Sequence, residues 1–279
     1  MKSNIIDGNA VIRFEKWLIE DEKSEKTREK YLRDVRAFLV FLSDQPLCKE
    51  LVILYKQQLI DKGYAVRSIN SMLASVNRFL CFVGHVECKV KNLKVQREVY
   101  CSEKRELTKK EYMRLLNAAK SRPRLYLLLQ TIAGTGIRVS ELKYFTVEAV
   151  SRGEVRVSAK GKIRRILLPS KLKALLLNYA KRNGISTGVI FRTKNGNPLD
   201  RSNIWSEMKS LCKEAAVEEG KVFPHNLRKL FARTFYALEK DIAKLADILG
   251  HSRIDTTRIY IISTGIEHRK KIEKLGLVV

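Results

Sequence analysis

Apolar residues in the first third of the chain recur with the period of an α-helix. One such series, at offsets of 0, 4, 7, 8 and 11 residues, is Tyr31, Val35, Phe38, Leu39 and Leu42. This spacing places the side chains on one helix face. The same period returns over residues 69–83, and the shorter stretches 11–19 and 51–60 carry it as well. The pattern predicts a bundle of four amphipathic helices, with Thr27 and Ser68 as N-caps of the two longer ones.

Helical periodicity continues in the rest of the chain, where one hairpin interrupts it. Thr108 and Glu111 have the spacing of a capping box at the start of a helix. Further helices are predicted over residues 125–132, 171–181 and 202–216. Residues 154–168 instead alternate apolar and polar side chains on both sides of Lys160-Gly161, which is typical of a β-hairpin with a basic turn. The predicted fold class is mainly α, with a small antiparallel β-sheet in the second part.

The periodicity stops between Gly84 and Glu106. This stretch holds six basic residues, Lys89, Lys91, Lys94, Arg97, Lys104 and Arg105. We interpret it as a basic linker that divides the chain into a helical domain at 1–86, the linker itself at 87–106 and a second domain at 107–279. Such a linker can follow a DNA backbone, but a surface loop without a partner explains the same charge.

The charge of the chain indicates a polyanionic partner. Its 279 residues include 55 Lys and Arg against 30 Asp and Glu, which gives a net charge of +25 spread along the whole sequence. Such a surface attracts phosphates and releases their counterions. A nucleic acid fits this property, and a basic protein without such a partner is the alternative.

Targeting and redox signals are few. Charged residues interrupt the N-terminal region, and no apolar run approaches the ~18 residues of a membrane span. The five cysteines are odd in number, and none has the paired short spacing of a zinc site. We expect a cytoplasmic protein with reduced thiols, no membrane contact and no metal site. There is no P-loop, so nucleotide hydrolysis is not supported.

Residues suited to phosphate chemistry lie in the second domain. They are two arginines, two histidines, an acidic residue, a hairpin lysine and a tyrosine, namely Arg138, Arg228, His225, His251, Glu141, Lys160 and Tyr260. Arginine forks bind non-bridging phosphate oxygens and stay charged, and histidine can move a proton near neutral pH. A lysine can protonate a leaving oxygen, and a tyrosine hydroxyl can attack phosphorus to form a covalent ester.

The motifs that hold these residues resemble those of the tyrosine recombinases, which include phage and transposon integrases and Xer-type resolvases. They are ThrGlyIleArgValSerGluLeu, AlaLysGlyLysIleArg, ProHisAsnLeuArg and LeuGlyHisSerArgIleAspThrThrArgIleTyr. The last two are the most specific, in this order and with 23 residues from Arg228 to His251. The resemblance covers nearly the whole chain. It implies a helical, SAM-like core-binding domain, a basic linker and a catalytic domain with a C-terminal oligomerisation tail.

The resemblance also implies a role for each site residue. Tyr260 is the nucleophile, Arg138 and Arg228 clamp the phosphate, and Lys160 is the general acid to the 5′ oxygen. The hairpin is one residue shorter than the common family pattern, so Lys162 is a rival for the lysine role. Taken singly, each residue also has an ordinary explanation as a surface charge or a partly buried aromatic.

Supporting roles fall to the remaining residues of the set. By the same resemblance, His225 transfers a proton, His251 donates a hydrogen bond to the phosphate, and Glu141 holds Arg138 or its helix. Many relatives carry a histidine directly after the second arginine, where this chain has Lys229, so the surroundings of Arg228 differ from the family pattern.

The activity implied is site-specific DNA recombination through a 3′-phosphotyrosyl intermediate and a Holliday junction, without a cofactor. The partners implied are double-stranded DNA sites and, in the synaptic complex, three further copies of a chain that is monomeric when free. Integration and excision of a mobile element are the expected role, and dimer resolution of the Xer type is the alternative. A type IB topoisomerase, a catalytically inactive DNA-binding protein and an RNA-binding protein are other readings. The recombination site and any directionality factor are left open.

Overall fold

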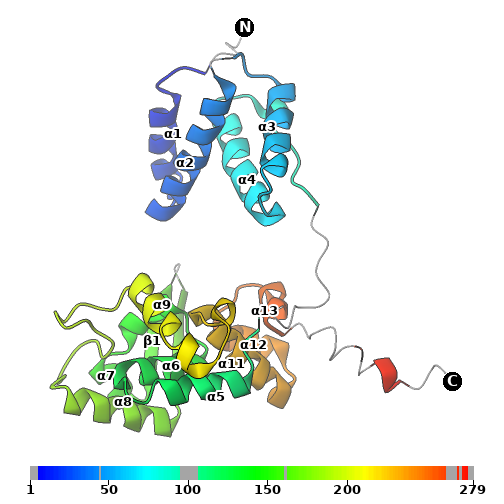
Figure 1. The fold of residues 1–279 in the computed structure, drawn as a ribbon. Coiled ribbons are helices and arrows are strands. Elements are labelled where there is room, and N and C mark those ends of the chain that lie inside the picture. Colours follow the sequence, from blue (N-terminus) through cyan, green and yellow to red (C-terminus); the bar gives the residue numbers. More distant parts are fainter. Residues whose placement is uncertain are drawn as a thin grey trace. The chain divides into compact units, whose positions relative to one another are not determined.

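Two compact units make up the chain, Met1–Arg97 and Glu98–Val279 (Figure 1). The computed structural model describes residues 6–43, 45–94, 106–159, 162–261, 269 and 272–275. Each unit has its own buried core. The fold is mainly helical, with one two-stranded antiparallel sheet in the described chain, as the hydrophobic pattern predicted. Among these residues, no helix combines the length and the apolar composition needed to cross a bilayer.

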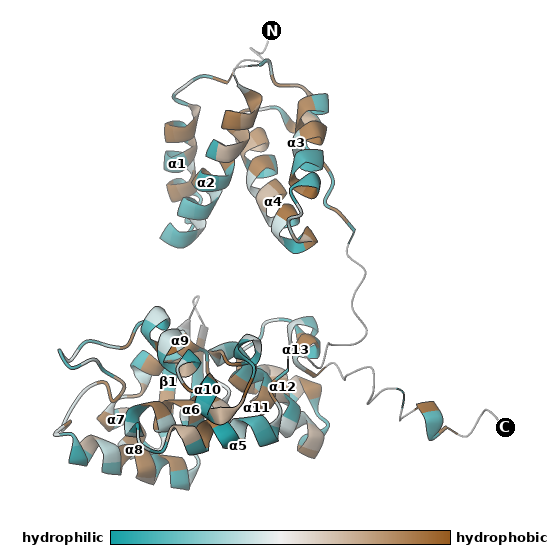
Figure 2. Ribbon diagram, viewed as in Figure 1, coloured by the Kyte–Doolittle hydropathy of each residue, from teal (hydrophilic) through white to brown (hydrophobic). Residues whose placement is uncertain are grey.

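The first unit is a bundle of four helices, α1 (Ala10–Glu20), α2 (Glu25–Leu42), α3 (Lys49–Asp61) and α4 (Val66–Phe82). Hydrophobic and hydrophilic residues alternate along each of them (Figure 2), so each helix can bury one face. Phe14 of α1 meets Phe79 of α4 edge-on, with ring centroids 5.2 Å apart. Phe38 of α2 meets Tyr55 of α3 in the same way at 5.1 Å. Aromatic contacts therefore tie neighbouring helices of the bundle together.

The two N-caps predicted for this bundle are wrong. Ser24 precedes α2 and Ala65 precedes α4, so Thr27 and Ser68 lie inside the first turns. The amide of Thr27 donates to the carbonyl of Ser24 over 2.8 Å, and that of Ser68 donates to the carbonyl of Ala65 over 2.7 Å. The side chains of both first turns largely face solvent. The periodic apolar residues that we used to locate each helix therefore begin about one turn after its first helical residue.

The chain after α4 stays on the first unit up to residue 94. A short 3-10 helix, η1 (Val86–Cys88), leads into extended chain up to residue 94. The side chain of Asn77 pairs with the backbone of Val90 at 3.0 and 2.9 Å, and Asn70 pairs with the backbone of Leu93 at 2.8 and 2.9 Å. These two asparagines hold the extended segment in the way that a neighbouring strand would.

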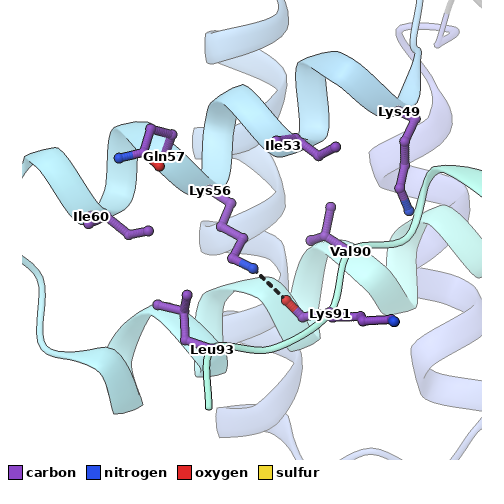
Figure 3. A pocket seen from close by; sticks show the side chains of 8 residues that line it. All are labelled: Lys49, Ile53, Lys56, Gln57, Ile60, Val90, Lys91 and Leu93. Atoms are coloured by element: carbon purple, nitrogen blue, oxygen red, sulfur yellow. Dashed lines mark hydrogen bonds between the residues drawn. The ribbon is translucent and has the colours of Figure 1, made fainter. Parts of the chain in front are cut away.

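This extended segment and α3 border a groove with an apolar floor and a basic rim (Figure 3). Lys56 reaches across it from α3 and donates to the carbonyl of Lys91 over 2.9 Å. The first part of the predicted linker at 87–106 is thus part of the first unit. Of the rest of that prediction, residues 95–105 lie outside the described chain, and Glu106 is a buried residue of the second unit.

The second unit contains nine α-helices and 3-10 segments beside one hairpin in its described part. In chain order they are α5 (Lys109–Ala118), α6 (Pro123–Thr135), η3 (Val139–Tyr144), α7 (Val147–Arg152), β1 (Glu154–Ala159), β2 (Lys162–Leu167), α8 (Ser170–Arg182), α9 (Arg201–Lys209), α10 (Cys212–Ala215), η4 (Glu219–Lys221), α11 (Pro224–Glu239), α12 (Ile242–Leu249) and α13 (Ile254–Ile261). The capping box predicted for α5 is confirmed, since Thr108 and Glu111 bond each other's backbone.

Helix α6 runs through the core of this unit. It packs against both α8 and α11, and its buried residues include Leu125, Leu127, Leu128, Leu129 and Ile132. A run of this kind is apolar on nearly every side, which suits a helix that other helices cover.

Two differences from the predicted helices occur in this unit. The helix α7 was not predicted, and the predicted helix 202–216 is divided into α9 and α10 at Ser210, whose hydroxyl donates to the carbonyl of Glu207 over 2.8 Å.

The predicted hairpin is confirmed, with β1 and β2 paired from Glu154↔Leu167 to Ala159↔Lys162. Val155, Val157 and Ile166 are buried on one face. Ile163 and Leu167 are exposed on the other, as alternation along a strand requires. Arg164 is two residues from Ile166 and therefore lies on the buried face.

Candidate active site

The site residues of the second unit gather around the C-terminal end of α12. Helices α11, α12 and α13 lie next to one another (Figure 1). His225 and Arg228 belong to the N-terminal part of α11, His251 follows α12, and Tyr260 lies in α13. Arg138 precedes η3, shortly after the end of α6.

A glycine turn brings the end of α6 to the site. Gly136 has a left-handed φ of +64°, and a Cβ there would lie 2.4 Å from Cδ1 of Phe231. Only glycine meets both conditions without strain. The carbonyl of Gly136 accepts a hydrogen bond from Nη1 of Arg228 over 2.5 Å. The turn therefore also supplies one hydrogen-bond acceptor for the buried guanidinium.

Arg228 is the largest polar side chain in the core of the site, with 1% of its surface exposed. Its Nη2 donates to the carbonyl of Leu249 over 2.7 Å and to Nε2 of His251 over 3.0 Å. Burial lowers its pKa to about 10, against the opposing effect of the Tyr260 hydroxyl, so it stays charged at neutral pH. None of the described carboxylates forms an ion pair with it, and its Nε is buried without a partner. A buried cation with neutral partners strongly favours an incoming anion.

Arg138 is the more accessible of the two predicted clamp residues, with 40% of its side chain exposed. Its Nη1 donates to Oε1 of Glu141 over 3.1 Å, and its backbone amide donates to Oε2 over 2.8 Å. Glu141 itself is 1% exposed. Its carboxylate thus holds Arg138 by both side chain and backbone, while the exposed part of the guanidinium stays accessible to a phosphate.

Tyr260 lies between the two histidines and beside Arg228. The ring centroids of His225 and His251 are each 5.1 Å from that of Tyr260, and Cζ of Arg228 is 5.9 Å from the same centroid. The tyrosine is buried, and all four residues come from one copy of the chain. The ring of Tyr260 is therefore positioned among cationic and proton-accepting side chains.

His251 is neutral at physiological pH. Burial, and next the charges of Arg228, Arg138 and Arg164, lower its pKa to about 4. Arginine can only donate, so Nε2 of His251 is the acceptor of the bond from Arg228. The proton of the ring is then on Nδ1, which lies 2.9 Å from Oγ1 of Thr257. The hydrogen bonds fix one tautomer of this histidine.

His225 differs from His251 in exposure. Its ring packs on Tyr260, although the residue as a whole is exposed, whereas His251 is half-buried. Desolvation of the packed part, followed by the charges of Lys229, Arg228 and Arg138, lowers its pKa below the ordinary value. A neutral imidazole beside a tyrosine can accept the proton of the hydroxyl.

The hairpin lysine is the one part of the predicted set that the structure does not place. Lys160 lies outside the described residues, and so does the side chain of Lys162, although the backbone of Lys162 pairs with Ala159. The assignment of the lysine role to Lys160, with Lys162 as its rival, therefore stays a prediction.

Two residues of the site were missed from the sequence. Arg164 donates to Glu141 and to the end of α12, and Thr257 is the partner of His251. A threonine inside a polar motif gives no signal of its own. Arg164 gives none either, because the apolar residues of β2 fall on both faces, with Ile163 and Leu167 exposed and Ile166 buried.

Ligand types that suit a metal ion also meet in the first unit. One atom each of His85, Glu87 and Cys88 lies within 4.8 Å of the others, although the cysteine spacing had suggested no such group. Burial raises the pKa of the Cys88 thiol, and the ammonium of Lys49 donates to the carbonyl of Glu87 over 3.2 Å. A protonated thiol and a neighbouring cation both oppose metal binding, and we assign the group no function.

Two family descriptions match the chain. The phage integrase family matches residues 105–265, and the phage integrase N-terminal SAM-like domain matches residues 11–85. Among curated proteins, the tyrosine recombinase XerA of Thermococcus kodakarensis is 32% identical over 98% of this chain and 97% of its own length. The tyrosine recombinase XerA of Pyrococcus furiosus is 28% identical over 100% of this chain and 98% of its own length.

Solved structures agree on the fold. A lambda integrase dimer bound to a core site is similar with a TM-score of 0.74 at 21% identity, over 92% of this chain and 95% of that one. A lambda integrase tetramer bound to a Holliday junction is similar with a TM-score of 0.72 at 20% identity, over 92% of this chain and 78% of that one. The chain belongs to the phage integrase family of tyrosine recombinases, the site-specific enzymes that break and rejoin DNA.

Proposed function

We propose that the protein recombines specific DNA sites by using Tyr260 as the nucleophile. The observation that carries this proposal is the position of Tyr260, with its ring between His225 and His251 and beside the charged Arg228. Nucleophile, proton acceptor and phosphate-binding cation lie together in one copy of the chain. Such a set can act in cis on a single phosphodiester.

The proposed cleavage is a balanced exchange of one phosphoester for another. The Tyr260 oxygen attacks phosphorus, and its proton passes to the neutral His225. The bond from phosphorus to the 5′ oxygen breaks, and that oxygen takes a proton from the hairpin lysine, Lys160. The products are a 3′-phosphotyrosyl ester and a free 5′ hydroxyl. Attack by the 5′ hydroxyl of a partner strand reverses the steps and rejoins the DNA.

Arg138 and Arg228 would stabilise the five-coordinate phosphorus. Among the described residues of the free protein, Arg228 has neutral hydrogen-bond partners, and the Arg138 side chain is partly exposed. The negative charge that develops on the non-bridging oxygens would be neutralised by donors already in place, which requires little reorganisation. A phosphate next to His251 would favour its protonated form, and Nε2 could then donate to the phosphate as the family resemblance implies.

Assembly with DNA is proposed by analogy. Lambda integrase has been seen as a dimer on a core site and as a tetramer on a Holliday junction. We propose that four copies of this chain, monomeric when free, join two sites and exchange one pair of strands at a time. A directionality factor remains a proposal. The substrate would place the reaction in the compartment that holds the DNA.

Two biological roles fit this chemistry. Integration and excision of a mobile element is the first. Dimer resolution is the second, and the full-length similarity to recombinases named XerA favours it. The roles differ in the DNA used, so a junction formed by excision of the DNA around the gene would support the first. Resolution of a plasmid with two copies of a chromosomal site would support the second.

The reaction can be tested by trapping the covalent intermediate. Nicked duplexes carrying candidate sites from the flanking DNA, labelled at the 5′ end of the cleaved strand, are incubated with the wild type, Tyr260→Phe and Tyr236→Phe. Tyr236 packs in the same cluster as Tyr260, so it is the matched control. We expect a labelled adduct on a denaturing gel with the wild type and Tyr236→Phe but none with Tyr260→Phe.

Other outcomes would lead to other functions. Tight binding to a specific site without an adduct under any condition would indicate a catalytically inactive DNA-binding protein. Adducts on any sequence together with relaxation of supercoiled DNA that lacks paired sites would indicate a topoisomerase. An adduct that persists in Tyr260→Phe would assign the nucleophile to another residue.

A further inference from the structure

Arg164 is a buried charge that the reaction described above does not use. It lies on the buried face of β2, and 14% of its side chain is exposed. Its Nη2 donates to Oε2 of Glu141 over 2.5 Å, and its Nη1 donates to the carbonyl of Ile248. Both ends of the guanidinium are therefore occupied by protein acceptors, and no oxygen of a DNA phosphate can replace them without breaking this pairing.

The contacts of Arg164 complete a regular arrangement at the end of α12. Arg164 donates to the carbonyl of Ile248, Arg228 to that of Leu249 and Arg138 to that of Gly250. Three arginines thus bind three successive carbonyls that no longer have partners within the helix. The C-terminal end of a helix also carries partial negative charge, which favours cations there.

The three arginines differ in how firmly they are held. The bond from Arg138 to the carbonyl of Gly250 is 3.4 Å long, and this side chain is the most exposed of the three. Arg138 can therefore turn towards a phosphate. Arg164 is held instead by the carboxylate of Glu141 and by the carbonyl of Ile248. Arg228 is also fully engaged, but by the neutral acceptors Gly136, Leu249 and His251. Of the three, Arg164 is thus the largely buried one whose charge is paired with a buried carboxylate while a carbonyl holds its other end.

Glu141 shows what Arg164 contributes. Its Oε1 accepts from Arg138 and its Oε2 accepts from Arg164. Without Arg164, this nearly fully buried carboxylate would have Arg138 as its one cationic partner among the described residues. A carboxylate in that position would draw both donors of Arg138 to itself in a bidentate pair and withdraw them from the phosphate.

Gly250 links the same arginine to His251. A Cβ at Gly250 would lie 2.6 Å from Cδ of Arg164, so the arginine stem packs directly over the turn that leads into His251. Movement of Arg164 would release this turn and, with it, the ring that contacts Tyr260.

Resting on the proposed function, we propose that Arg164 is a positioning residue, which holds Glu141 and the end of α12 so that Arg138 and His251 face the scissile phosphate. Since β2 begins at Lys162, the same contact anchors the strand that follows Lys160, the predicted general acid, in the sequence. The planar fork of arginine spans two acceptors at once, which the single ammonium of lysine does not do in this geometry.

The test compares Arg164→Met and Arg164→Lys with Arg165→Met in the full-length protein. Arg165 is the next residue of β2, but its side chain is 69% exposed and it pairs at 3.8 Å with Glu154. Single-turnover cleavage of the nicked duplex gives the rate, and titration of the uncleaved site gives the affinity. We expect Arg164→Met to slow cleavage about 100-fold and Arg164→Lys about 10-fold. Affinity should stay within about threefold, and Arg165→Met should cleave like the wild type.

A second readout does not depend on activity. Nuclear magnetic resonance titration of ¹³C-labelled histidines follows His251 directly, and Arg164 is one of the cations that lower its pKa. Arg164→Met should raise the pKa of His251, and Arg165→Met should leave it unchanged. This result tests the contact even if the wild type forms no adduct and the proposed function fails.

Further comparison separates positioning from general stability. In Glu141→Gln, no buried carboxylate is left to capture Arg138, so adding Arg164→Met should slow cleavage much less than about 100-fold. Arg164→Met that cleaves at the wild-type rate would overturn the proposal. So would a folded Arg164→Lys protein with full activity, because the bidentate fork would then be unnecessary.

Discussion

Arg228 donates a hydrogen bond from Nη2 to Nε2 of His251 over 3.0 Å. A donor that is charged at neutral pH thus occupies the nitrogen with which the histidine would otherwise contact a phosphate. In the free enzyme the two side chains satisfy each other's hydrogen-bonding groups at this point. DNA must separate them or change the protonation of the ring, so binding and chemistry are coupled at this pair.

Thr257 sets the tautomer of His251, and its removal should weaken catalysis. Its hydroxyl lies 2.9 Å from Nδ1, and the residue is fully buried. In Thr257→Val the shape is retained, but the ring proton on Nδ1 loses its acceptor and the ring can flip. We expect about 10-fold slower cleavage in single-turnover assays and nearly unchanged affinity for DNA.

Thr256→Val is the matched control for this change. Thr256 is the neighbouring threonine and is exposed, so its replacement should leave the cleavage rate intact. Equal rates for the wild type and Thr257→Val would show that the orientation of His251 does not depend on this hydroxyl.

The lowered pKa of His251 makes the stability of the second unit depend on pH. In the unfolded chain the residue takes up a proton near its ordinary pKa of ~6.5, whereas in the folded protein its pKa is lowered to about 4. Between these values the unfolded state binds more protons. The contribution of His251 to the free energy of unfolding should therefore be complete above about pH 6.5. It should be lost as the pH drops towards 4, which lowers the free energy of unfolding by no more than about 3 kcal/mol.

Urea denaturation measures this effect if one tryptophan reports the second unit. The chain has two tryptophans, Trp17 and Trp205, so Trp17→Phe leaves Trp205 of α9 as the probe. The stability of this protein should fall between pH 7.5 and 5.0, and His251→Gln in the same background should reduce the fall. Identical pH dependence of the two proteins would mean that His251 has an ordinary pKa.

Arg228→Lys should lower both stability and the cleavage rate, although the substitution retains the positive charge. Lysine has one ammonium group, but the guanidinium binds the carbonyls of Gly136 and Leu249 and the ring of His251 at once. At least one buried acceptor would lose its partner, at a cost of about 1–3 kcal/mol in the free energy of unfolding. Cleavage should fall about 1,000-fold. A variant that cleaves within tenfold of the wild type would show that charge alone suffices.

The sequence predicted those parts of the site that rest on side-chain spacing. His225 and Arg228 share a face of α11, and Pro224 at its first position marks where the helix begins. These features follow from helix geometry and the fixed φ of proline. The resemblance of the motifs then brought Arg138 and Tyr260 into the same set.

The partners of these residues could not be predicted in the same way. The acceptors of Arg228 include backbone carbonyls at Gly136 and Leu249, and every residue has such a carbonyl. Only the path of the chain decides which ones meet the guanidinium. The N-caps at Thr27 and Ser68 failed for a related reason, because the buried stripe of a helix carries no mark of its solvent-facing first turn.

Gly136→Ala should destabilise the second unit because two separate costs combine there. The residue has a left-handed φ of +64°, and the new Cβ would lie 2.4 Å from one ring carbon of Phe231 and 2.8 Å from another. Gly184→Ala is the matched control, with nearly the same φ of +63° but nothing within 4 Å of its Cβ. The control should lose about 1 kcal/mol from backbone strain alone. Gly136→Ala should lose about 3 kcal/mol or more, because the ring of Phe231 must move in a packed core.

Displacement of this turn also moves the carbonyl that binds Arg228, so cleavage should fall in Gly136→Ala and not in Gly184→Ala. Urea denaturation and single-turnover cleavage measure the two effects, and equal losses of stability in both variants would show that the contact with Phe231 yields without cost.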